Sequence, residues 1–133
     1  MAGIEEAMTA VLLADSDVTD LIGDKIFPMR APDDFARPYI VYQKVTGPRE
    51  ESHSGDSDLA HPRIQLSCWS DTYAEAKAVA RTVIGSLHSF VGTSMGIDIQ
   101  ASTIDGEVDT FDDATKLYRT VVDVIFWHRE VLT

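Results

Sequence analysis

The stretch RIQLSCWSDTYAEAKAVA, residues 63–80, decides the fold class of this chain. Its first eight residues alternate between apolar and polar side chains, which predicts a half-buried strand. Thr72 then begins a capping box with Glu75, and helical spacing of the following apolar residues predicts a helix to about Phe90. The predicted buried stripe of this helix consists of Tyr73, Ala76, Ala80, Val83, Leu87 and Phe90. A strand followed directly by an amphipathic helix indicates helices that cover a sheet.

The segments before residue 63 extend this pattern towards the N-terminus. Apolar residues at helical spacing predict a helix over Gly3–Ala14, and a short second helix follows, with Gly23 as its C-cap. Ile26–Pro28 is expected to be extended, and the proline-containing segment Met29–Pro38 to be irregular. Tyr39–Thr46 is rich in β-branched and aromatic residues, which predicts a strand.

The C-terminal third predicts two more strands. Gly92–Gly96 is expected to form a turn, and Ile97–Ile104 alternates, which places Ile97, Ile99 and Ala101 on one face. Leu117–Arg129 is the longest predicted strand, with Tyr118, Val122, Val124 and Phe126 on the face towards the helices. We therefore predict one α+β domain over residues 1–133. Its mainly antiparallel four-stranded sheet is covered by two helices, in the order α-(short α)-β-β-α-β-β.

Two long acidic loops are predicted, over residues 47–60 and 105–116. Each is longer than most connections between neighbouring strands, so we expect both to be assembly elements. We expect Arg49 to anchor the first loop, because a guanidinium can pair bidentately with a carboxylate of the second loop on a neighbouring subunit. The alternative is a solvated loop that contacts no partner. The candidate interface residues are Arg49, Glu50, Glu51, His53, Asp56, Asp58, Asp109, Asp112 and Asp113.

Composition and charge exclude several classes of function. The chain has 11 Lys and Arg against 22 Asp and Glu, a formal net charge of −11. Such a surface is poorly suited to wrapping nucleic acid or to docking on anionic lipid, because both need clustered cations. Cys68 is the single cysteine, so no intrachain disulfide can form. Glu5 and Glu6 stand where a signal peptide would be basic, and no stretch of 18 apolar residues predicts a membrane span.

No catalytic, cofactor or metal site is expected. His53 and His61 flank an acidic stretch, but no HExxH or CxxC spacing accompanies them. An EF-hand read from Asp105 fails, since its sixth position is Thr110 and its twelfth is Lys116. The sequence also lacks a GxSxG elbow, a GxGxxG motif and a P-loop, which argues against an enzyme.

Aromatic residues are the remaining signal. The predicted strands carry more of them than one buried face of a sheet can hold: Tyr39, Tyr42, Trp69, Tyr118, Phe126 and Trp127. Trp69 in particular falls on the face opposite Ile64 and Leu66. Two interpretations stay open, packing within the domain or a face that binds another protein, since aromatics are enriched in the cores of interfaces.

Taken together, four ordered landmarks resemble the tail-completion (tail-terminator) family of long-tailed bacteriophages. They are DSDVTDLIGDKIFP at residues 15–28, RPYIVYQKVTG at 37–47, RIQLSCWSDTYAEAKAVA at 63–80 and KLYRTVVDVIFWHRE at 116–130. The resemblance covers nearly the whole chain. The third landmark is the most specific, with a strand that ends in tryptophan and a capped helix that begins Tyr-x-Glu-Ala.

The resemblance implies a structural role in a virion. Similar proteins form a six-fold ring at the head-proximal end of the tail tube, stop tube growth and offer a surface to the head connector; gene transfer agents use similar parts. The implied partners are further copies of the chain, the tail tube protein and the head-tail connector protein, with DNA passing through unbound. The implied location is the tail neck, after synthesis in the cytoplasm of a bacterial host. The alternatives are a head-side connector or stopper protein of the same neck, or a non-viral oligomeric α+β binding module.

Overall fold

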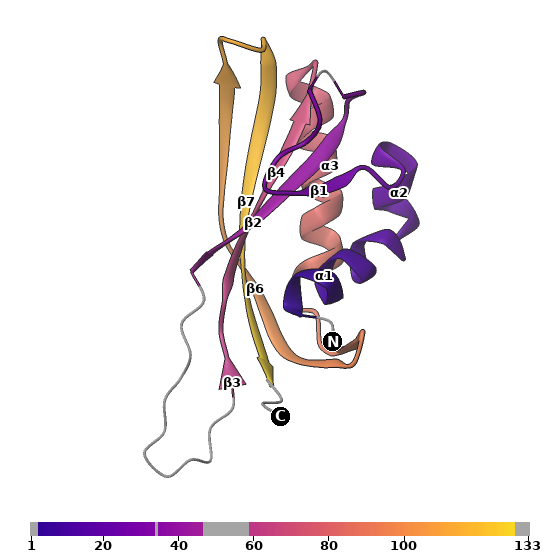
Figure 1. Ribbon diagram of the computed structural model, residues 1–133, viewed down its shortest axis with the longest axis vertical. Coiled ribbons are helices and arrows are strands. Elements are labelled where there is room, and N and C mark those ends of the chain that lie inside the picture. The colour runs from indigo at the N-terminus through magenta and orange to yellow at the C-terminus, as the bar shows by residue number, and fades with distance from the viewer. Residues whose placement is uncertain (1–2, 34, 47–58, 130–133) are drawn as a thin grey trace.

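The computed structural model describes residues 3–33, 35–46 and 59–129 as three helices and a curled, mixed sheet (Figure 1). The helices are α1 (Ile4–Leu13), α2 (Ser16–Ile22) and α3 (Tyr73–Leu87). The strands are β1 (Ile26–Pro28), β2 (Tyr39–Thr46), β3 (Leu59–Ala60), β4 (Arg63–Ser70), β5 (Gly92–Ser94), β6 (Ile97–Asp112) and β7 (Leu117–Arg129). The α+β class is therefore as predicted.

The sheet is larger than the predicted four antiparallel strands. Its order is β1-β2-β4-β7-β6-β5, and β3 pairs with the end of β7. The four predicted strands, β2, β4, β6 and β7, form its antiparallel centre. The added strands have two or three residues each, too few to show a periodicity. One of them, β1, runs parallel to β2, which makes the sheet mixed. Another, β5, occupies the start of the predicted turn at Gly92–Gly96.

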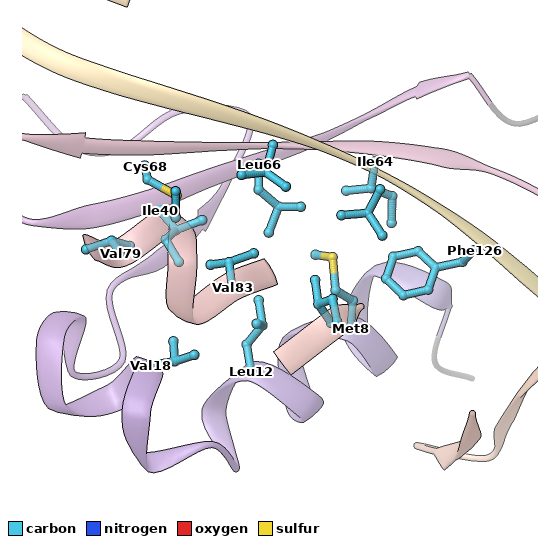
Figure 2. Close-up of a cluster of buried hydrophobic side chains, with 14 of the residues drawn as sticks. Met8, Leu12, Val18, Ile40, Ile64, Leu66, Cys68, Val79, Val83 and Phe126 are labelled. Carbon is cyan, nitrogen blue, oxygen red and sulfur yellow. The ribbon is translucent and has the colours of Figure 1, made fainter. Parts of the chain in front are cut away.

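All three helices cover the same face of the sheet, and the core lies between the two layers (Figures 1 and 2). Ile64, Leu66 and Cys68 point from β4 into this core, as their alternation predicts. Phe126 of β7 is fully buried there beside Met8 of α1. The opposite face of the sheet has no helix over it within the described residues.

One of the two hydrogen bonds of the predicted capping box is present at the N-terminus of α3. Thr72 Oγ1 accepts the backbone N–H of Glu75 at 3.1 Å. The Glu75 carboxylate does not reach back to the cap, however, because it accepts a hydrogen bond from the Ser70 hydroxyl. The predicted stripe of α3 is correct in its middle and wrong at both ends: Tyr73 is half exposed, and Phe90 lies beyond the last helical residue, Leu87.

Strand β6 corrects two sequence predictions. The predicted loop over residues 105–116 is wrong: β6 continues to Asp112, and a tight turn over residues 113–116 leads into β7. Acidic residues are depleted in strands, so the composition of this segment favoured a loop. The segment is a strand because β7 pairs with it up to Asp112, and composition does not reveal such a partner. Two β-bulges interrupt the pairing, between Ile99 and Ala101 and between Ile104 and Gly106. The first puts Ala101 on the face away from Ile99, against the predicted alternation.

Candidate functional site

The nine predicted interface residues fall into two groups. The six from the predicted loop over residues 47–60 lie outside the described residues: Arg49, Glu50, Glu51, His53, Asp56 and Asp58. The other three lie in or beside the turn of the β6–β7 hairpin: Asp109, Asp112 and Asp113. The described part of the predicted site therefore lies in the β6–β7 hairpin.

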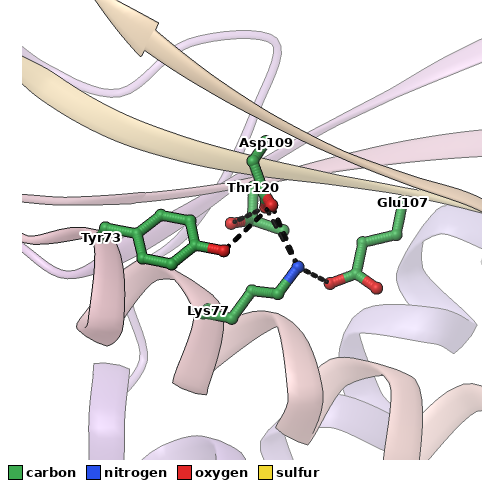
Figure 3. Close-up of polar contacts among 5 residues, drawn as sticks. All are labelled: Tyr73, Lys77, Glu107, Asp109 and Thr120. Carbon is green, nitrogen blue, oxygen red and sulfur yellow. Dashed lines mark hydrogen bonds and ion pairs between the residues drawn. The ribbon is translucent and has the colours of Figure 1, made fainter.

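Asp109 is the centre of a polar cluster on the helix side of the sheet (Figure 3). Its Oδ1 accepts the Thr120 hydroxyl at 2.9 Å, and both of its carboxylate oxygens lie 3.2 Å from Lys77 Nζ. Tyr73 donates its hydroxyl to Asp109 Oδ2 at 3.3 Å, and Lys77 Nζ also lies 2.7 Å from Glu107 Oε2. The cluster joins two residues of α3, two of β6 and one of β7.

The bulges of β6 explain how two acidic residues come to face a helix. Pairing places Glu107 opposite Val122 and Asp109 opposite Thr120, and these two β7 residues face the helices. Lys77, one helical turn after Tyr73, meets both carboxylates. The hydrogen bond that Lys77 donates to Glu107 raises the pKa of Lys77. Partial burial of Asp109 opposes its ionisation, but hydrogen bonds from Thr120 and Lys77 prevail and lower its pKa.

The hairpin turn holds the other two predicted residues. Asp112 closes β6, and its carboxylate accepts the Thr115 hydroxyl at 2.6 Å. This bond, with the backbone N–H groups of Ala114 and Thr115, lowers the pKa of Asp112. Lys116 has a φ of 60°, in the left-handed region, and its N–H donates to the Asp112 carbonyl at 2.8 Å. Asp113 is exposed at the tip of the turn, where it is accessible to another chain.

The described residues contain no recognisable reaction centre. No group of three or more His, Cys, Asp or Glu in this part of the chain is arranged to hold a metal ion. Cys68 is buried in the core, and burial raises the pKa of its thiol. Among the same residues, no helix has both the length and the apolar character to cross a membrane.

The face of the sheet that no described helix covers carries a groove. Its cavity volume is about 340 Å³, and its lining includes Met29, Arg30, Tyr39, Trp69, Leu117 and Arg119. The Arg119 guanidinium lies 5.1 Å from the centroid of the Trp69 ring, and its Nε donates to Thr110 Oγ1 at 3.1 Å. We call this feature the sheet-face groove. Tyr39 and Trp69 are paired neighbours on β2 and β4, so the groove has an aromatic floor.

Elsewhere on the same face, Arg63 links β4 to the β6 edge through an ion pair with Asp105 and lies 4.0 Å from Asp123 of β7. The hydrogen bond that Arg63 donates to Asp105 raises the pKa of Arg63. The sequence prediction did not identify this group or the cluster around Lys77. A signal for the cluster was present: Glu107, Asp109 and Phe111 alternate, as residues on one face of a continuing strand do.

Comparison with known proteins identifies the family of this chain. The sequence model of the family described as tail completion protein gp17 matches residues 6–129, nearly the whole chain. The chain belongs to this family. The resemblance carried by the four sequence landmarks is thereby confirmed. This tail completion family member is accordingly a structural protein of a phage-type tail and a component of the virion.

A solved structure shares the fold of this family member. A chain from a structure titled "Virion of native gene transfer agent (GTA) particle" superposes with a TM-score of 0.78, at 15% sequence identity, over 96% of this chain and 95% of that one. At 15% sequence identity, this structural similarity shows a shared fold and nothing further. No curated protein sequence matches the chain significantly.

Proposed function

We propose that this tail completion family member caps the head-proximal end of a tail tube, terminates growth of the tube and joins it to the head connector. The observation that carries the proposal is the family match over residues 6–129. In the proposed assembly the chain forms a homo-oligomeric ring, six-fold as the sequence resemblance implies, at the neck of the particle. Its partners are the tail tube protein on one side and the head-tail connector protein on the other.

The described structure supports a role in assembly in two ways. The polar clusters of the chain are used to hold its own elements together, as Lys77 shows by bridging α3 to two β6 carboxylates. One whole face of the sheet is without a helix over it and presents aromatic side chains, which suits contact with other proteins. The exposed Asp113 at the hairpin tip and residues 47–60 remain the proposed points of contact with a neighbour or the tube.

Charge is consistent with DNA transit through such a ring. Six copies at −11 each would carry −66 in total. If acidic side chains line the channel, they repel the phosphates of DNA, so the genome passes without binding. Two cations beside β6, Lys77 and Arg63, are already paired with carboxylates.

The test is a particle lacking this chain. Deletion of its gene is expected to give tails of uncontrolled length and heads without tails, both counted by electron microscopy. Supplying the wild-type chain in trans is expected to restore joined particles. Tails of normal length on joined heads in the deletion strain would overturn the proposal.

The same experiment separates the alternatives. Normal-length tails that fail to join, with the tagged chain imaged on the heads, would identify a head-side connector or stopper protein. A deletion without any particle defect, and a chain missing from purified particles, would leave a non-viral oligomeric binding module.

A further inference from the structure

We propose that the outer edge of β6, over residues 107–111, pairs with an extended segment of a protein other than this chain, which adds a strand to the sheet. The inference deepens the proposed function and rests on it, because it takes the donor of that strand from the proteins that meet this chain in the particle. Figure 1 shows this part of β6, in orange, at the margin of the sheet, with no described element on its outer side.

The backbone of β6 can be oriented from the hydrogen bonds of its neighbour β7. The N–H of Phe126 donates to the Pro62 carbonyl at 3.0 Å, so the even-numbered residues of β7 direct their backbone groups to the β4 side. Alternate residues of a central strand bond to opposite neighbours, so the odd-numbered residues of β7 bond β6. Those residues pair with Val108 and Thr110, whose N–H and C=O groups therefore point to β7.

The residues between and beside these two carry the open edge. Glu107, Asp109 and Phe111 each direct an N–H and a C=O group away from β7. The Ser102 carbonyl points the same way before the second bulge, and it accepts the N–H of Ser89 at 3.1 Å. Among the described residues, no partner bonds the outward groups of the other three. These are the backbone groups that a further strand would bond.

Exposed apolar side chains lie on both faces of the sheet at this edge. Val108 is 57% exposed on the face away from the helices, and Phe111 is 45% exposed on the helix side, beside Tyr118. The pairing with β7 is regular from Gly106 to Asp112, because both bulges come earlier in the strand. A regular edge of this kind suits strand addition, in which the main chain supplies hydrogen bonds and alternate side chains supply contacts.

The other described edges of a second copy are poor donors of this strand. In β1, the N–H of Ile26 already donates to the Asp24 carbonyl at 2.9 Å, and Pro28 has no N–H to give. Beyond β1, strand β2 leaves residues 44–46 at its edge, and a bulge interrupts them. Strand β5 lies against α1.

Pairing of β6 with β6 of a second copy is opposed by like charges. Full antiparallel overlap puts Asp109 opposite Asp109 of the other copy, and a shift by one pair puts Glu107 opposite Asp109. Like charges directly opposite each other destabilise a sheet. Residues 47–58 of a second copy contain four acidic residues against Arg49, so their composition opposes this pairing as well. The donor is therefore assigned to a different protein.

The side chains of this edge define the chemistry of the donor. Lys77 Nζ lies 2.7 Å from the Glu107 carboxylate and 3.2 Å from that of Asp109, so two carboxylates share one ammonium and keep a net charge of −1. A lysine or arginine on the helix side of the donor strand balances this charge. On the other side of the donor, an apolar side chain covers Val108.

Hydrogen–deuterium exchange resolved to single amides tests the edge. In the isolated chain, the N–H groups of Glu107, Asp109 and Phe111 are expected to exchange rapidly, and those of Val108 and Thr110 slowly, because the latter two bond β7. In purified particles, the three outward groups are expected to exchange about tenfold more slowly than in the isolated chain. The two inward groups are the internal control. Rapid exchange of the outward groups in particles that contain the chain would overturn the inference.

Proline substitution tests the hydrogen bonds. Phe111→Pro removes an outward N–H without removing a bond to β7, and the matched control Phe111→Ala removes the same ring but keeps the N–H. In a complemented deletion strain, Phe111→Pro is expected to give about a tenfold lower yield of joined particles than Phe111→Ala. Equal yields, from two chains with the same melting temperature, would contradict the pairing. The exchange measurement does not depend on these variants.

Photocross-linking identifies the donor. Benzoylphenylalanine in place of Val108 is expected, in particles, to join to a peptide of another particle protein, which mass spectrometry identifies. The control is the same probe in place of Val91, which is 70% exposed beside β5 at the other end of β6, and it is expected not to give this product. Cross-links from position 108 to peptides of this chain alone would overturn the assignment to a different protein.

The outcomes separate this inference from the proposed function. Tails of uncontrolled length and unjoined heads after gene deletion, together with rapid exchange of the outward groups in complemented particles, would overturn the edge pairing alone. A chain that is absent from purified particles would overturn the proposed function, and the edge pairing with it.

Discussion

The hydroxyl oxygen of Ser102 on β6 lies 2.6 Å from the backbone nitrogen of Phe90, just after the end of α3. The same hydroxyl donates to the carbonyl of Leu87, the last residue of the helix. One buried side chain therefore satisfies two backbone groups at the helix end, and it fixes the end of α3 against the sheet.

Ser102→Ala is expected to lower the free energy of unfolding by about 1–3 kcal/mol, because it removes the hydroxyl bonds of these two backbone groups and leaves only the 3.4 Å bond from the Phe90 N–H to the Leu87 carbonyl. Urea denaturation at neutral pH measures the change. The control is Thr103→Ala at the next, exposed position, with an expected effect within about 0.5 kcal/mol. Equal effects of the two substitutions would contradict the role assigned to the Ser102 hydroxyl.

Asp109→Asn is expected to reduce stability in a pH-dependent way. The folded pKa of Asp109 is lowered, so its ionised form stabilises the fold above its ordinary pKa of about 3.9. The variant should therefore unfold more readily than the wild type at pH 7. The difference should shrink as the pH falls below about 4, through the lowered folded pKa, where the wild-type carboxylate also becomes neutral. Thermal unfolding across this range checks the prediction, and a difference that does not change with pH would contradict it.

Phe126→Ala is expected to cost about 3–5 kcal/mol of stability, because a fully buried aromatic ring leaves a cavity between β7 and α1. The matched control is Val108→Ala, whose side chain is 57% exposed, with little expected change. Chemical denaturation of both variants gives the comparison. An unchanged melting temperature for Phe126→Ala would show that the inward face of β7 is wrongly assigned.

Replacement of residues 49–58 by a short glycine-containing turn is expected to separate assembly from folding. None of the described core residues lies in this segment, so the melting temperature should change little. The yield of joined particles should collapse, because the segment includes Arg49, the expected anchor to a neighbouring subunit. Complementation of a deletion strain gives the yield. Normal yields with the shortened chain would show that the segment is dispensable for assembly.

Much of the fold could be predicted because β4, β7 and the middle of α3 each follow a single period without interruption. The alternation of β4 predicted which of its side chains are buried, and the helical spacing in the middle of α3 did the same. The errors lie where a neighbour decides the structure. Strand β3 has two residues and exists through its pairing with β7, which local sequence does not encode.

The candidate site was harder to predict for the same reason. The acidic composition of residues 105–116 indicated a solvated loop, but the partner strand converts most of it into β6. The positions of Glu107 and Asp109 then depend on two bulges that no periodicity reveals. Lys77 was passed over because its role requires knowing which strand lies beneath the helix. The prediction that Trp69 lies opposite Ile64 and Leu66 is confirmed, since alternation alone determines it.

The two bulges of β6 also determine where this strand can change length. Gln100 and Asp105 are each the additional residue that β7 leaves unmatched. Deleting either one keeps every other residue opposite its present partner, whereas deleting Thr103 would turn the side chains on one side of the gap to the wrong face. Relatives of different length are therefore expected to place their alignment gaps in this strand at positions 100 and 105, and to conserve the spacing from Gly106 to the hairpin turn.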